Sequence, residues 1–205
     1  MPGRNIYKQY APDTYYHVYN RGVDKQAIFR DDDDYAAFLH LLKRYLDPTD
    51  RSERTANSRS YPCYDQDITL HAYCLMPNHF HMLMYQITDN GMRQLMKSVT
   101  VAYSMYFNKK YKRVGPLFQQ RYRAVRMLNE AQFLHSTRYI HLNPDSYKSY
   151  EWSSYEYYTG ARRSAWLKPD PILDCFSSQK QYLEFVEDYT EKRAELAQLK
   201  ADLSL

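Results

Sequence analysis

Two histidines one residue apart, His79 and His81, stand in the apolar segment 79–86. Alternate residues on a strand point to the same face, so both imidazoles would project together while Phe80 enters the opposite layer. Two converging imidazoles provide half of a divalent-metal site. Two surface histidines on a half-exposed strand are the simpler alternative, so the spacing alone does not decide between them.

A second set of polar side chains repeats at helical spacing farther along the chain. His135, Tyr139 and Asn143 lie at positions i, i+4 and i+8, whereas Phe133 and Ile140 face another way and can supply a core contact. The amide oxygen of Asn143 is a hard ligand suited to Mg²⁺ or Mn²⁺. A helix lying beside the histidine strand would bring a phenolic hydroxyl and a third ligand to one metal. Ordinary packing at the edge of an amphipathic helix is the alternative for Tyr139.

Length and composition limit the class of protein. The chain has 205 residues, 44% hydrophobic and 25% charged, with no apolar run near the ~18 residues of a membrane span. The N-terminus lacks the apolar stretch of a secretory signal. The three cysteines form no C-x-x-C pair, which argues against a disulfide scaffold. We therefore expect a soluble, cytoplasmic protein.

The periodic segments predict an α+β fold. The order is strand, helix, two strands joined by a tight turn, helix, strand and helix, at residues 14–19, 33–46, 68–75, 79–86, 91–108, 121–128 and 129–143. The first six form the ferredoxin-like split β-α-β arrangement, an antiparallel sheet with both helices on one face. Residues 49–66 form a polar loop and residues 145–178 an irregular aromatic segment, and a final helix begins near Gln179.

Several short segments together resemble the HUH single-tyrosine transposases of insertion sequences, and more narrowly the REP-associated tyrosine transposases. The resemblance is carried by His79-Phe80-His81 after Met76-Pro77-Asn78, and by Arg138-Tyr139-Ile140-His141-Leu142-Asn143-Pro144. The further matches are Tyr16-His17-Val18-Tyr19-Asn20-Arg21-Gly22, Gly115-Pro116-Leu117-Phe118-Gln119 with Arg121-Tyr122, and Trp152-Ser153-Ser154-Tyr155. They run in order over residues 14–160.

The resemblance implies a DNA strand transferase. Family members cut single-stranded DNA, often at the foot of a hairpin, and rejoin strands through a 5′-phosphotyrosine intermediate. By position, Tyr139 is the nucleophile, and His79, His81 and Asn143 hold a divalent metal, Mg²⁺ or Mn²⁺. Insertion-sequence members commonly have glutamine at the last position, whereas the shorter asparagine suits the REP-associated branch. Residues 1–145 would be the catalytic domain with its extra catalytic helix, and residues 146–205 a C-terminal helical extension.

The partner implied is single-stranded or hairpin DNA, in a bacterial, nucleoid-associated protein. The net charge of +4 and the 23 tyrosines suit a phosphate backbone with bases stacked beside it. The DNA contacts we expect are phosphate or base-edge contacts from Arg21, Lys97, Arg121 and Arg123, with Tyr103 or Tyr122 as stacking platforms. Relatives act as dimers or as monomers, so monomer and homodimer both stay open.

Two other functions fit parts of the sequence. A non-catalytic nucleic-acid-binding module would use the same fold but needs neither the paired histidines nor Tyr139. A zinc hydrolase is disfavoured because the sequence has no H-E-x-x-H helix and no nearby third histidine or carboxylate. No general base is obvious; His135 and His141 are candidates, and a structural or DNA-facing role is the alternative for each.

Overall fold

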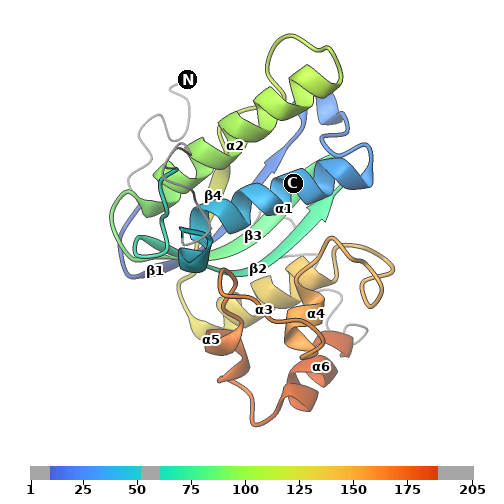
Figure 1. The fold of residues 1–205 in the computed structure, drawn as a ribbon. Helices are drawn as coiled ribbons and strands as arrows, with labels where there is room; N and C mark the ends of the chain where they lie inside the picture. Colours follow the sequence, from blue (N-terminus) through green and yellow to red (C-terminus); the bar gives the residue numbers. More distant parts are fainter. Residues whose placement is uncertain (1–9, 52–60, 189–205) are drawn as a thin grey trace, which may run out of the picture.

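The structure is a computed structural model that describes residues 10–51 and 61–188 (Figure 1). Its strands are β1 (Thr14–Arg21), β2 (Ile68–Met76), β3 (His79–Gln86) and β4 (Arg123–Arg126). Its longer helices are α1 (Asp32–Leu46), α2 (Gly91–Lys110), α3 (Glu130–His141) and α6 (Gln179–Glu187). The short helices are α4 (Tyr155–Tyr158), α5 (Asp170–Leu173) and the 3₁₀ turns Val23–Lys25 and Pro48–Arg51. The later part of the predicted final helix lies outside the described residues.

The four strands form one sheet in the order β2-β3-β1-β4, with every neighbouring pair antiparallel. This order is the ferredoxin-like arrangement, so the predicted fold class is confirmed. Helices α1 and α2 lie side by side on one side of the sheet, whereas α3 to α6 gather on the other side, around β2 (Figure 1). Helix α3 packs against β2 and β3.

Alternation along β3 separates the two sides of the sheet. Phe80 is fully buried and its ring lies 5.2 Å from that of Phe38 on α1. The ring of His81 instead lies 5.2 Å from that of Tyr139 on α3. Because neighbouring side chains on a strand point to opposite faces, α1 and α2 cover one face and α3 covers the other. The histidines therefore face α3, as the sequence predicts.

Polar contacts join the start of α1 to the end of α2. Asp31 caps α1 by accepting a hydrogen bond from the Asp34 N–H. The Lys110 ammonium lies 2.6 Å from Asp31 and 2.9 Å from the fully buried Asp34, and the Tyr111 hydroxyl donates to Asp34 as well. The charge of Lys110 is therefore neutralised by the acidic start of α1.

Helix α3 begins as the sequence predicts and ends slightly earlier. The Asn129 side chain accepts from the Gln132 N–H, and the Gln132 side chain accepts from the Leu128 N–H, which satisfies two backbone donors at the helix start. The last helical residue is His141, because the residue before a proline avoids the helical conformation. Asn143 thus stands just beyond the helix end.

The segment 145–178 has more structure than the sequence suggests. It contains α4 and α5, and it adds single β-bridges to the outer edge of β2, from Ser153 to Cys74 and from Leu167 to Leu70. The physical reason is that the exposed edge of β2 offers unpaired backbone groups. A local aromatic pattern cannot reveal this pairing, since the partner residues Cys74 and Leu70 lie far earlier in the chain.

Candidate active site

The histidine strand and the tyrosine helix meet within one chain. The rings of His79 and His81 on β3 lie 5.0 Å apart and nearly perpendicular. Tyr139 of α3 lies with its ring 5.2 Å from His81, edge to face. The convergence that a shared metal site requires is therefore present without a second copy of the chain.

Asn143 stands between the two elements and affects both. Burial lowers the pKa of His79 to about 4; the Arg21 guanidinium acts in the same direction, and a hydrogen bond with Asn143 opposes it. Burial raises the pKa of Tyr139 to about 12, and Asn143 and Arg21 both act to lower it. At neutral pH His79 is therefore neutral and able to bind a metal, while Tyr139 keeps its proton.

Arg21 reaches this site from the last position of β1. It pairs with His79 in the sheet register, and residues directly opposite in an antiparallel pair share a face. Its guanidinium Nε is buried with no hydrogen-bond partner in the described part of the chain. The turn that follows needs Gly22, because a Cβ there would lie 2.2 Å from the Gln26 carbonyl oxygen. A cation with an unused buried donor suits an anionic ligand.

A third histidine, His17 on β1, completes the cluster. Its Nε2 lies 2.9 Å from Nδ1 of His81, and the two rings stack with centroids 4.9 Å apart. His17 is fully buried, and burial lowers its pKa to about 3. No spacing within β1 marks His17 as a site residue, because its partner His81 lies on a different strand.

The donor atoms fit an open divalent-metal site. Nδ1 of His79 lies 2.6 Å from the Asn78 side-chain oxygen, and Nδ1 of His81 faces His17, so each imidazole would bind a cation through Nε2. Among residues 10–51 and 61–188, no group of three or more His, Cys, Asp and Glu side chains could hold a metal. Two imidazoles and the Asn143 amide oxygen leave further coordination positions for substrate.

Of the four predicted basic residues, Arg21 and Arg123 share the histidine face of the sheet, whereas Lys97 does not. Tyr19 of β1 pairs with His81 on one side and with Arg123 of β4 on the other. Arg123 therefore lies on the same face as His81, two strands away, which is roughly 10 Å across the sheet. Arg121 is exposed just before β4. Lys97 is exposed on α2, in the layer on the opposite side of the sheet.

The two predicted stacking platforms lie inside the protein. Tyr103 is fully buried on the inner face of α2, and its hydroxyl donates to the Ile28 carbonyl at 2.5 Å. Tyr122 is 8% exposed and packs beside Tyr10. A ring enclosed on both faces has no surface for a nucleobase. The expectation that these tyrosines stack on DNA bases therefore does not hold for the structure as it stands.

The two candidate general bases have structural partners. His141 is fully buried, with Nδ1 2.7 Å from the Tyr182 hydroxyl and Nε2 2.8 Å from the Ser154 hydroxyl. His135 lies 2.8 Å from the guanidinium of Arg138. These contacts favour the structural alternative for both, because neither ring is directed to the Tyr139 hydroxyl by any of them.

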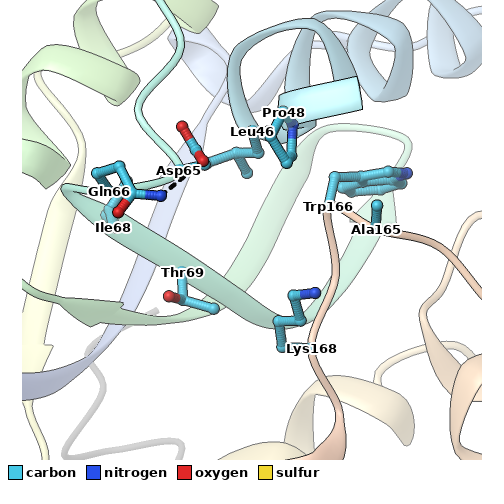
Figure 2. Close-up of a pocket in the computed structure, with 9 residues that line it drawn as sticks. All are labelled: Leu46, Pro48, Asp65, Gln66, Ile68, Thr69, Ala165, Trp166 and Lys168. Carbon is cyan, nitrogen blue, oxygen red and sulfur yellow. Dashed lines mark hydrogen bonds between the residues drawn. The ribbon is translucent and has the colours of Figure 1, made fainter. Parts of the chain in front are cut away.

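A separate pocket lies at the β2 edge, away from these residues. Trp166 and Lys168 form one side and Leu46 with Pro48 the other (Figure 2). Asp65 on its rim already accepts a hydrogen bond from Gln66. The pocket contains none of the predicted site residues. Of the helices in the described residues, none has the length and apolar character needed to cross a membrane.

The chain matches a known family of transposases. A protein-family model described as "Transposase IS200 like" matches residues 13–143, which is more than half of the chain. The chain therefore belongs to the IS200-like transposase family, and the resemblance drawn from its motifs is confirmed. Membership makes it a DNA-cleaving transposase of the tyrosine type.

The chain is also similar to a solved structure over most of its length. That structure is described as a REP-associated tyrosine transposase bound to a REP hairpin, and the match covers 84% of this chain and 94% of that one, with a TM-score of 0.52 and 14% sequence identity. At that identity the likeness supports the fold. No protein of curated function matches the sequence.

Proposed function

We propose that this transposase is a metal-dependent strand transferase that cuts single-stranded DNA at the foot of a hairpin, with Tyr139 as the nucleophile. The observation that carries the proposal is the 5.2 Å separation of the Tyr139 and His81 rings, with His79 and Asn143 beside them in the same chain. The hairpin is proposed because the similar solved structure is described as bound to one.

The metal site would consist of Nε2 of His79, Nε2 of His81 and the amide oxygen of Asn143. Mg²⁺ and Mn²⁺ accept mixed nitrogen and oxygen ligands with open positions. Either ion bound there would supply positive charge to a non-bridging oxygen of the scissile phosphate. A histidine must be neutral to bind a metal, and His79 is neutral at physiological pH because burial lowers its pKa to about 4.

The transfer step uses groups of this chain. The Tyr139 oxygen forms a bond to phosphorus as the bond from phosphorus to the 3′ oxygen breaks, and the phenolic proton is released as the 3′ oxygen takes one up. Arg21 and Asn143 favour this step because both stabilise the phenolate form of Tyr139. A second 3′-hydroxyl reverses the step, so the phosphodiester bond energy is conserved without ATP.

Access to the nucleophile requires local movement. Tyr139 is 2% exposed, whereas His79, Asn143 and Arg21 are each partly exposed. These three side chains therefore form the solvent side of the site. We infer that DNA enters past them, and that their displacement uncovers the Tyr139 hydroxyl.

The DNA would lie across the histidine face of the sheet toward β4. Arg21 and Arg123 both share that face, and Arg121 is exposed next to it. Residues 1–145 would form the catalytic part and residues 146–205 its C-terminal extension, in a nucleoid-associated cytoplasmic protein. A monomer is sufficient for the site, because one chain supplies both histidines and the tyrosine.

The test is covalent capture of DNA. The full chain is incubated with a hairpin oligonucleotide carrying a single-stranded 5′ flank and Mn²⁺, and denaturing electrophoresis separates the products. We expect a denaturation-resistant adduct with the wild type and none with Tyr139→Phe. The control is Tyr85→Phe, since Tyr85 is a half-buried tyrosine of β3 whose hydroxyl bonds only to Asp13 among the contacts described.

Two outcomes separate the alternatives. An adduct that persists in Tyr139→Phe would show that another nucleophile acts. Tight hairpin binding with no adduct in the wild type would favour the non-catalytic nucleic-acid-binding module.

A further inference from the structure

The two metal-binding histidines differ in what holds their second nitrogen. Nδ1 of His79 faces the side-chain oxygen of Asn78 at 2.6 Å. An amide oxygen only accepts hydrogen bonds, so the proton of neutral His79 is on Nδ1 and the lone pair on Nε2. Nδ1 of His81 instead faces another imidazole, that of His17, which can donate or accept.

Only one proton fits between His17 Nε2 and His81 Nδ1, which are 2.9 Å apart. If His17 carries it, neutral His81 must carry its own proton on Nε2, and that nitrogen cannot bind a cation. If His81 carries it on Nδ1, the Nε2 lone pair is available and His17 is protonated on its own Nδ1. The partner of His81 therefore decides whether this ligand is ready for metal.

The geometry fixes this contact tightly. His17 and His81 are both fully buried, and their rings stack at 13° to each other. The His17 ring also meets Tyr139 edge to face at 5.9 Å. His81 therefore cannot turn away from His17 without disturbing the packing beside the nucleophile.

We propose that His17 is a positioning residue that orients His81 and accepts its Nδ1 proton, so that His81 binds the divalent cation through Nε2. This inference rests on the proposed function, in which His81 is a ligand. Both rings are fully buried, so a cation at His81 Nε2 would favour the arrangement in which the proton between the two rings is on His81 Nδ1 and His17 carries its own proton on Nδ1.

Calorimetric titration of the full chain with Mn²⁺, without DNA, measures the ligand set directly. We expect His17→Phe, which keeps a stacked ring but no acceptor, to bind Mn²⁺ about 10- to 100-fold more weakly than the wild type. His17→Gln, whose side-chain oxygen can accept from His81, should recover most of that loss. The control is His71→Phe, because His71 is another buried histidine whose Nδ1 contacts the Lys168 carbonyl rather than a ligand.

A second readout locates the proton. Two-bond ¹H–¹⁵N spectra of the imidazoles, recorded on the wild type with saturating Mg²⁺, should show both His81 and His17 protonated on Nδ1 and not on Nε2. His81 with its proton on Nε2 in the Mg²⁺-bound protein overturns the proposal. This measurement does not depend on the folding of any variant.

The possible failures are distinguishable. Equal Mn²⁺ affinity of the wild type and folded His17→Phe overturns the role of His17 and leaves the strand-transferase proposal intact. A wild type that binds neither Mn²⁺ nor Mg²⁺ overturns the metal site itself, and with it both proposals.

Discussion

Two clusters in this protein combine histidine with tyrosine, and they differ in how completely their polar atoms are bonded. His141 uses both ring nitrogens on protein partners, Tyr182 and Ser154. Ser154 in turn accepts from the Tyr73 N–H at 2.8 Å, and all four residues are buried. At the other cluster, His79, Asn143 and Arg21 remain partly exposed around Tyr139.

The difference teaches that residue type alone does not identify a reactive histidine. A ring whose two nitrogens are both bonded inside the core has no atom left for substrate or metal. The His141 cluster instead joins α3 to α6 and to β2, and Arg138 adds a contact from its guanidinium to the Phe185 ring at 4.5 Å. One cluster is suited to chemistry, and the other holds the helix that carries Tyr139, the proposed nucleophile.

The largest effect should come from the exposed cluster. We expect His81→Ala or His79→Ala to reduce strand cleavage by about a thousandfold or more, because loss of the metal removes several kcal/mol of charge stabilisation at the phosphate. Hairpin affinity, measured by fluorescence anisotropy, should stay within a few-fold, since the metal acts on the scissile phosphate rather than on the DNA contacts. Equal loss of binding and cleavage in folded protein would contradict this separation.

The buried cluster should affect stability instead. His141→Ala removes the partner of Tyr182 and Ser154 and opens a cavity, so we expect the free energy of unfolding to fall by about 3 kcal/mol. Urea denaturation at pH 7 measures this change. Cleavage per folded molecule should be retained at low temperature. If His141→Ala lost cleavage while keeping wild-type stability, His141 would belong with the chemistry and the comparison would be wrong.

The stability of the protein at low pH should also depend on the buried His141 cluster. Burial lowers the pKa of His141 to about 3, well below its ordinary value of 6.5. Between pH 6.5 and 3, the His141 ring is therefore protonated in the unfolded chain and neutral in the folded chain. The stability that this ring contributes is present above pH 6.5 and is lost as the pH falls toward 3. Each buried neutral histidine changes the free energy of unfolding by up to about 1.4 kcal/mol per pH unit in this range.

The check is urea denaturation at several pH values between 6.5 and 4. We expect the free energy of unfolding of His141→Gln to fall less steeply with decreasing pH than that of the wild type. The difference in slope should correspond to roughly one bound proton. An unchanged slope in this variant would mean that His141 titrates alike in the folded and unfolded chain.

The smallest effect concerns the DNA surface. Hairpin binding should weaken steeply with salt, and Arg123→Ala should reduce the salt slope by about one unit, because one phosphate contact is lost. Lys97→Ala serves as the matched control, since Lys97 lies in the opposite layer. Anisotropy titrations at several salt concentrations measure both. A lower slope with Lys97→Ala alone would place the DNA on the α2 side of the sheet.

Much of the architecture follows from periodicity that is local in the chain. Alternation along β3 places His79 and His81 opposite Phe80, and the 3.6-residue period of α3 places Tyr139 on the helix face one turn after His135. The same logic explains Tyr103, because its spacing with Val99 and Phe107 belongs to the apolar face of α2, which the structure buries. Its expected role in DNA stacking conflicted with a pattern already present in the sequence.

The sequence by itself determined the order of strands and helices and the two polar motifs, because each depends on residues within a few positions of one another. Only the tertiary structure decided that His17 contacts His81, that Arg123 shares their face and that His141 is enclosed by Tyr182 and Ser154. Those relations depend on strand register and on contacts between distant segments. Whether a side chain can bind a ligand then depends on which of its polar atoms its neighbours leave without a hydrogen bond. The spacing of residues along the chain does not encode this.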